Sequence, residues 1–93
     1  MTTETTILDF QLSNTYEEYE AHINAKEQQT MFKEMGVSTF YIGKSLDDPQ
    51  RATVIFQGPE NVLYDIFINS ETKPIVEASG HIYEDTKITR WIS

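Results

Sequence analysis

Polar and apolar residues alternate along four segments of this chain, and a period of two residues is typical of half-buried β-strands. The segments are residues 6–12, 37–43, 51–57 and 82–92. In the first segment Leu8, Phe10 and Leu12 share one side of the predicted strand. The third segment is the most continuously apolar, which predicts a central position in a sheet.

A helical spacing of apolar residues follows the first strand. Tyr16, Tyr19 and Ile23 lie on one face of a predicted helix. Asn14 precedes this face, and Glu17 stands three residues later, which is the spacing of a capping box. The pattern therefore predicts a helix that begins immediately after Asn14.

Further helical pieces follow on both sides of the middle strands. The apolar residues after Ile23 leave the first face, which predicts a break near residues 24–28 and a second helix over residues 25–35. Another helix is expected to begin at Pro59, since proline suits the first turn. Residues 74–79 are expected to form one more short turn. The apolar face of the helix after Pro59 consists of Val62, Leu63, Ile66 and Phe67.

The resulting order is strand, helix, strand, strand, helix, strand, which is the ferredoxin-like βαββαβ pattern of an α+β protein. Right-handed crossovers would place the first and third strands in the centre of an antiparallel sheet with the helices on one face. A chain of 93 residues fits a single domain of this kind, spanning residues 1–93.

Helices on one face leave the other face of the sheet open. If Leu8, Phe10 and Leu12 meet the helices, the open face still carries Ile7 and apolar residues of neighbouring strands. A partly apolar surface on so small a domain favours association. We therefore predict a homodimer that packs sheet against sheet, a dimeric α+β barrel. The alternative is a monomer with a few exposed β-branched residues.

Arg90 and Trp91 in the last strand are the candidate interface residues. If Arg90 points toward the helices, it needs a buried anionic partner. If it points toward the dimer face, an interface salt bridge suffices, and this second orientation is the one we predict.

Fifteen acidic residues against seven basic ones give a net charge of −8. Such a charge repels nucleic acids and anionic membranes, so neither is an expected partner. The chain has no cysteine, which excludes disulfides and thiolate sites. The first residues resemble no secretory signal, and the expected compartment is the cytoplasm. The four glycines are isolated, so no nucleotide-binding loop and no cofactor are expected.

His81 is the candidate catalytic residue, because a histidine beside Gly80 could act as a general base or contact a ligand near pH 7. The alternative is an exposed or locally hydrogen-bonded histidine. No metal site is expected, since His81 and Asp85 would lie about 13 Å apart in a regular strand. Aromatic residues could instead line a pocket between helices and sheet, or could simply form the core. The pocket candidates are Tyr16, Tyr19, Phe40, Phe56, Phe67 and Tyr83.

Four stretches of the chain are similar to those of a known family, namely residues 6–12 (TILDFQL), residues 35–43, residues 47–49 (DDP) and residues 78–82 (ASGHI). On these stretches the chain resembles a family of small cyanobacterial proteins of unknown function. The resemblance implies a ferredoxin-like domain of the dimeric α+β barrel class. More distantly, that class includes cofactor-free monooxygenases, haem-degrading enzymes and muconolactone-isomerase-like proteins, whose pockets lie between helices and sheet.

Two functional hypotheses follow. In the first, a dimeric barrel binds or transforms a small apolar or aromatic molecule without a metal. In the second, the dimer is a non-catalytic interaction or regulatory protein. The patterns leave open whether the protein is an enzyme.

Overall fold

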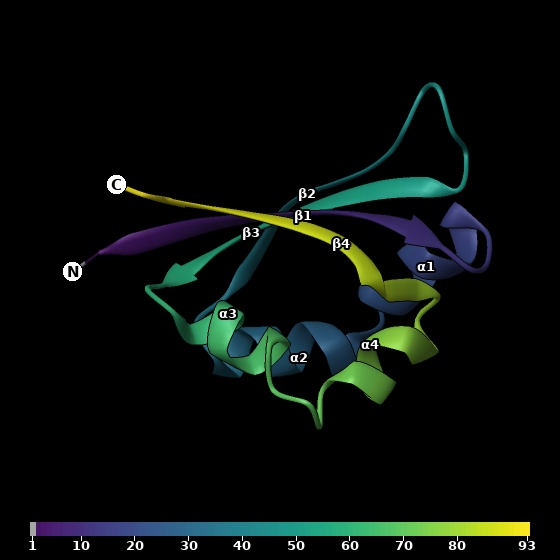
Figure 1. The fold of residues 1–93 in the computed structure, drawn as a ribbon. Helices are drawn as coiled ribbons and strands as arrows, with labels where there is room; N and C mark the ends of the chain where they lie inside the picture. Colours follow the sequence, from purple (N-terminus) through teal and green to yellow (C-terminus); the bar gives the residue numbers. More distant parts are fainter. Residues whose placement is uncertain (1) are drawn as a thin grey trace.

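The computed structural model describes residues 2–93 and places four short helices against one face of a four-stranded sheet (Figure 1). Met1 is the first residue of the segment for which no secretory signal was expected, and it lies outside the described residues. The elements are β1 (Thr3–Leu12), α1 (Tyr16–Ile23), α2 (Lys26–Glu34), β2 (Ser38–Lys44), β3 (Arg51–Pro59), α3 (Val62–Phe67), α4 (Lys73–Ala78) and β4 (His81–Ile92).

The strands lie in the order β2-β3-β1-β4, and each neighbouring pair is antiparallel. The first and third strands are therefore central, as predicted, and the ferredoxin-like α+β fold is confirmed. β1 is longer than predicted, because pairing with β3 and β4 extends to its start at Thr3.

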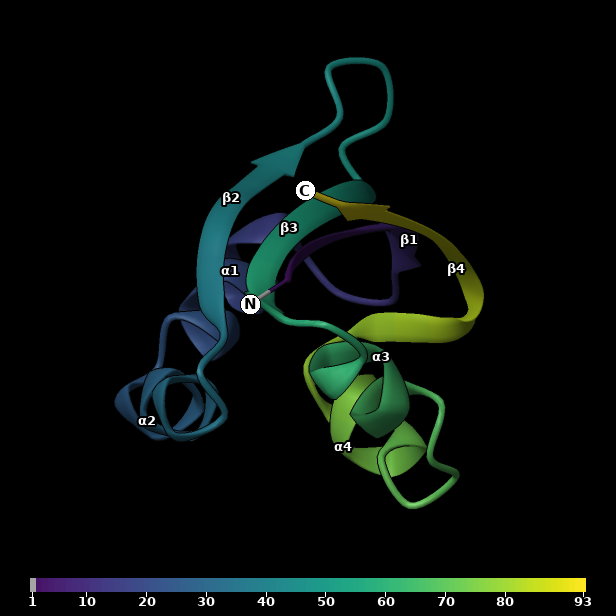
Figure 2. The same cartoon turned by 90° about the vertical axis from the view of Figure 1, so that its left-hand side faces the viewer.

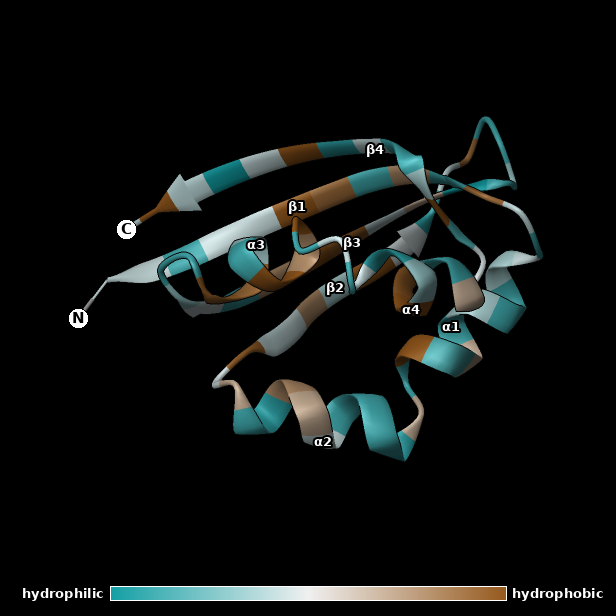
Figure 3. Ribbon diagram, turned by 60° about the horizontal axis from the view of Figure 1, so that its bottom comes forward, coloured by the Kyte–Doolittle hydropathy of each residue, from teal (hydrophilic) through white to brown (hydrophobic). Residues whose placement is uncertain are grey.

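The covered face of the sheet follows from the alternation in β1. Its even-numbered residues from Glu4 to Leu12 are all buried, and Val54 of β3 pairs directly with Leu8. Phe10 and Val54 have no exposed surface, so they mark the centre of the core. Figure 3 shows that α1, α2 and α4 carry single apolar bands in otherwise polar ribbons. Such short helices are marginal alone and depend on packing these bands against the sheet.

Two helix starts differ from the predictions. The N-cap of α1 is Thr15, whose Oγ1 accepts a hydrogen bond from the Glu18 backbone N–H at 3.1 Å. The sequence contains two possible capping pairs, Asn14 with Glu17 and Thr15 with Glu18. The structure uses the second pair, one residue later than predicted. Pro59 ends β3 instead of opening a helix, and α3 begins after Asn61, which has a left-handed φ of 72°. Among residues 2–93, every helix falls short of the length and apolar content that a bilayer crossing demands.

A β-bulge in β2 changes which of its side chains reach the core. Thr39 pairs with Phe56 and Tyr41 with Ile55, so Phe40 is an extra residue in the ladder. Phe40 is 67% exposed and Tyr41 54% exposed. The regular alternation predicted for this strand is therefore interrupted, and its aromatic residues lie outside the core.

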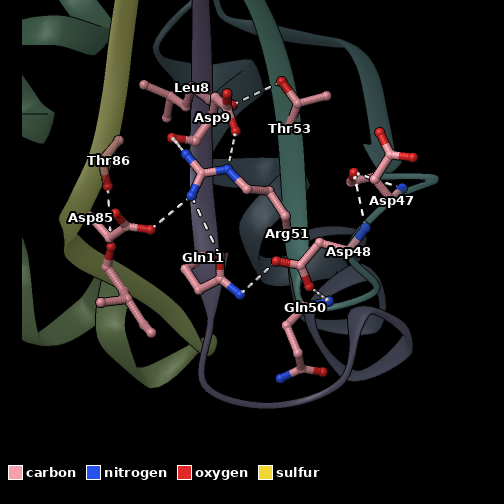
Figure 4. Close-up of polar contacts among 12 residues, drawn as sticks. Leu8, Asp9, Gln11, Asp47, Asp48, Gln50, Arg51, Thr53, Asp85 and Thr86 are labelled. Carbon is pink, nitrogen blue, oxygen red and sulfur yellow. Dashed lines mark hydrogen bonds and ion pairs between the residues drawn. The ribbon is translucent and has the colours of Figure 1, made fainter.

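The open face of the sheet has an apolar part and a charged part. In the apolar part, Ile7 pairs with Ile55, and Trp91 is 61% exposed nearby on β4. The charged part centres on Arg51, which is 2.8 Å from a carboxylate oxygen of Asp9 and 2.8 Å from one of Asp85 (Figure 4). These pairs tie β3, β1 and β4 together at one end of the sheet.

Arg90 lies on the covered side of the sheet, level with Thr6. It donates two hydrogen bonds of 2.9 Å to the carboxylate of Glu4, contacts Asn61 and lies over the ring of Tyr64. Hydrogen bonding to Arg90 lowers the pKa of Glu4 to about 2 despite burial. The predicted orientation of Arg90 toward a partner is therefore wrong, because a buried carboxylate 86 residues away provides its ion pair.

We predict that Arg90→Met lowers the melting temperature at pH 7 by several degrees, since Glu4 would stay buried without its cation. Differential scanning calorimetry measures the effect. The matched control is Lys73→Met, which removes the same charge from the exposed pair with Glu84. Exposed pairs contribute little, so this variant should melt close to the wild type. Equal shifts in both variants would contradict the prediction.

Candidate functional site

A cavity of about 100 Å³ lies on the covered side of the sheet. Figure 2 shows α2 below one half of the sheet and α3 with α4 below the other half, so the helices form two separate walls. The lining is mostly apolar and comes from β1, β3, β4 and all four helices. Its apolar residues are Leu8, Ile23, Met31, Phe32, Met35, Phe56, Leu63, Ile66, Phe67, Ile75 and Val76.

His81 lines this cavity from the first position of β4. The chain enters the strand through Gly80, which has a φ of 96°. A Cβ atom at this position would clash with the Asn14 side chain. A hydrogen bond of 2.8 Å from the Ser13 N–H to the Gly80 carbonyl holds this turn against the end of β1. Only glycine meets both requirements, so the turn fixes where His81 enters the core.

The imidazole of His81 is buried among aromatic rings. It stacks on Phe10 with centroids 3.6 Å apart and planes 8° from parallel, and it is 4% exposed. Tyr19 and Phe67 lie beside it at centroid distances of 6.4 and 5.7 Å. Of the two alternatives for the environment of His81, the exposed histidine is wrong, because β4 folds its first residue over Phe10.

Burial lowers the pKa of His81 to about 3, since the charged imidazolium would lose its hydration. The ring is therefore neutral at pH 7, and it is a weak base. Its Nε2 lies 2.7 Å from Oγ1 of Thr86. Among residues 2–93, no group hydrogen-bonds to Nδ1. This ring suits hydrogen bonding to a ligand better than proton abstraction.

Tyr19 is the second polar group deep in the cavity. Its side chain is buried, and burial raises the pKa of the phenol, so the hydroxyl stays protonated. His81 and Tyr19 thus belong to a largely apolar lining, whose other polar residues are His22, Gln28, Thr72 and Ser79. An apolar pocket with a few placed polar groups is the usual form of a small-molecule site.

Three of the six predicted pocket residues line the cavity, namely Tyr19, Phe56 and Phe67. The other three do not. Tyr16 directs its hydroxyl toward Glu20 at 3.3 Å. Tyr83 donates its hydroxyl proton to the Phe67 carbonyl at 2.6 Å and stacks on that ring.

Phe40 is the third residue outside the cavity and the clearest error. The bulge in β2 places it outside the core, 67% exposed. Sequence reasoning also missed the mouth of the cavity, where Met31, Ile66 and Ile75 are 41%, 37% and 58% exposed. One feature of the sequence could have indicated these residues. The apolar residues after Ile23 do not continue the first helical face, which indicates that the helices contact a second apolar surface besides the sheet.

Within residues 2–93, no three histidine, aspartate or glutamate side chains converge as a metal site would require. The cavity contributes His81 and His22 from different elements, without a carboxylate beside them in its lining. Its titratable groups are therefore two imidazoles and the phenol of Tyr19.

The fold and the cavity define a ferredoxin-like α+β protein with a candidate small-molecule site between helices and sheet. The chain belongs to the family described as a domain of unknown function, DUF3764, whose model matches residues 3–93. Comparison with curated protein sequences gives no significant match. The expected cyanobacterial origin is not tested by these findings and stays a prediction.

Solved structures of similar fold include several oxygenase-like proteins. A proposed antibiotic biosynthesis monooxygenase from Bordetella bronchiseptica matches with a TM-score of 0.65 and 11% identity over 98% of this chain and 96% of that one. A mutant of SnoaB, a cofactor-independent oxygenase from Streptomyces nogalater, matches with a TM-score of 0.60 and 11% identity over 98% and 90% of the two chains. A conserved protein from Methanosarcina mazei matches with a TM-score of 0.56 and 15% identity, over 98% of this chain and 92% of that one. At these identities the likeness establishes the fold alone.

We predict that His81→Gln weakens the dependence of stability on pH. Below pH 6.5 the unfolded state protonates His81, while the folded state stays neutral down to about pH 3. The wild type should therefore lose roughly 2 kcal/mol of unfolding free energy between pH 7 and pH 5 through this residue. Urea unfolding at both pH values measures the loss, and the glutamine variant should lack it.

The control is His22→Gln, which changes the only other histidine and leaves His81 in place, so the loss assigned to His81 should persist. Both pH values of the comparison lie above the range from about pH 2 to 4.5 in which Glu4 changes the stability with pH. An unchanged pH dependence in His81→Gln would show that the ring is solvated in the folded state.

Proposed function

We propose that this protein binds a small apolar or aromatic molecule in the cavity between its helices and sheet, and that binding can lead to its transformation. The observation that carries this proposal is the apolar cavity that the polar rings of His81 and Tyr19 help to line. Hydrogen bonds to these groups would orient the ligand, while the apolar walls would supply the binding energy.

The size of the cavity restricts the ligand. About 100 Å³ is less than the few hundred Å³ of a drug-sized pocket. A molecule with a single ring is the class that fits. A larger one would require the wall formed by α1 and α2 to separate from the wall formed by α3 and α4, and the exposed side chains of Met31 and Ile66 lie where these walls end.

Transformation of the ligand is supported by analogy of fold. SnoaB is described as an oxygenase that needs no cofactor. His81 is the candidate catalytic residue because it lines the cavity. As a neutral and weakly basic ring, it would act by hydrogen bonding to a ligand hydroxyl and so orienting it, rather than by holding a proton at pH 7.

The binding proposal predicts that Ile66→Trp abolishes binding of single-ring aromatic molecules, because the larger side chain occupies the cavity. The matched control is Ile68→Trp, two residues further along, where the side chain is 52% exposed outside the cavity lining. Titration with phenol, followed by ligand-detected NMR and by chemical shifts of the protein, measures binding. Binding that survives in Ile66→Trp, or that is lost equally in both variants, would contradict the proposed site.

We further propose a homodimer as the functional unit, with the open faces of two sheets in contact. Ile7 and Ile55 pair at the middle of this face, and Tyr41 and Trp91 offer exposed aromatic surface near them. A second copy would cover these residues and leave the Arg51 ion pairs at one end of the contact. An apolar face with a charged margin is typical of a protein interface.

The dimer predicts that Ile55→Glu gives a monomer, because burying an unpaired carboxylate in the contact is costly. Light scattering at micromolar concentration should then return a mass near 10.8 kDa, against twice that value for the wild type. Ile68→Glu, on the helix side of the molecule, is the control and should remain dimeric. A wild-type mass near 10.8 kDa would overturn the dimer.

The second candidate function is a non-catalytic interaction or regulatory dimer that responds to a bound ligand. The observation in its favour is the lowered pKa of His81, which makes the ring a poor general base at pH 7. With a net charge of −8, either form fits a cytoplasmic protein that binds neither nucleic acid nor anionic membranes.

A further inference from the structure

The hydroxyl of Thr86 forms a hydrogen bond with Nε2 of His81. A large irregularity in the pairing of β1 with β4 brings the two together: Phe10 pairs with Thr86, whereas Leu12, two residues later, pairs with His81. Five steps along β4 therefore span two steps along β1. The chain between them bulges outward, and the side chains at its two ends meet beside the Phe10 ring.

The hydroxyl of Thr86 has a second partner that determines its role. Its Oγ1 donates to the Ile82 carbonyl at 3.3 Å, and it lies 2.7 Å from Nε2 of His81. A hydroxyl has one proton, so an oxygen that donates to a carbonyl can only accept from its other neighbour. When the hydroxyl donates to Ile82, Nε2 carries the imidazole proton and Nδ1 presents a lone pair. The reverse assignment, in which Oγ1 donates to Nε2, would leave the Ile82 carbonyl without this donor.

We infer that Thr86 is a positioning residue that holds His81 in the Nε2–H tautomer, so that the cavity selects uncharged ligands that donate a hydrogen bond to Nδ1. The ligand preference rests on the proposed function, whereas the tautomer is argued from the contacts of Thr86 and does not depend on that function. The class of ligand is a small ring that carries a hydroxyl or an N–H group. A ring of the same size without a donor would leave the Nδ1 lone pair buried and unpaired, which is unfavourable.

The geometry also explains why a charged ligand is unsuited to the site. The stacked Phe10 ring and the apolar walls give no counter-ion to an ammonium or a carboxylate beside His81. Tyr19 adds a protonated hydroxyl that can donate to an oxygen of the ligand or accept from it. A ligand hydroxyl could thus donate to His81 and accept from Tyr19 at the same time.

The tautomer is tested by the ¹⁵N chemical shifts of the His81 ring, recorded by long-range ¹H–¹⁵N NMR without ligand. The wild type should show a protonated Nε2 and an unprotonated Nδ1. Thr86→Ser keeps the hydroxyl and should give the same pattern, whereas Thr86→Val has a similar shape without the hydroxyl and should shift protons toward Nδ1. An Nδ1–H ring in the wild type, or the wild-type pattern in Thr86→Val, would overturn the inference.

The ligand preference is tested with phenol and fluorobenzene, which have nearly the same size but differ in their hydrogen-bond donor. The wild type and Thr86→Ser should bind phenol about 10-fold more tightly, and Thr86→Val should lose most of this preference. Equal binding of both compounds to the wild type would overturn the selectivity while leaving the binding proposal intact. Binding of neither would overturn the proposed function, and the NMR pattern would still decide the tautomer. If Thr86→Val does not fold, the wild-type spectrum and Thr86→Ser remain decisive.

Discussion

The contact between Phe10 and His81 is the interaction on which the rest of this structure depends. Phe10 is wholly buried at the point where β1, α1 and β4 meet, with His81 stacked on its face and the Tyr19 ring at its edge, 5.2 Å away. Stacking at 3.6 Å excludes water from one side of the imidazole, so the same contact that closes the core keeps the ring neutral. Packing and site chemistry therefore have one origin.

The helices complete this core without filling it. Helices of six to nine residues fully bury at most two side chains each, and they lie as two walls over different halves of the sheet. The space between them costs packing energy that a filled core would gain. The Glu4–Arg90 pair offsets part of this cost, because it ties β1 to β4 and reaches the start of α3 through Asn61.

The two faces of the sheet differ in how their charges are compensated. On the covered face, Glu4 is buried and its carboxylate is fully engaged by Arg90 and the Asn61 N–H. On the open face, Arg51 shares its charge between Asp9 and Asp85, which remain partly in contact with solvent. The covered pair acts on stability, whereas the open cluster is available to orient a second copy of the chain.

The order of elements and the central strands were predictable from the sequence, because strand alternation and helical spacing are local properties of neighbouring residues. Which side of β1 meets the helices was left open by the sequence and is decided by the tertiary structure. The tertiary structure alone decided which charges and rings meet. Arg90 finds Glu4 across 86 residues, and Phe40 leaves the core through a bulge that β2 acquires only by pairing with β3. The small acidic α+β domain was thus evident from local patterns. The burial of His81, its partner Thr86 and the cavity beside them follow from long-range pairing, for which a single sequence carries no signal.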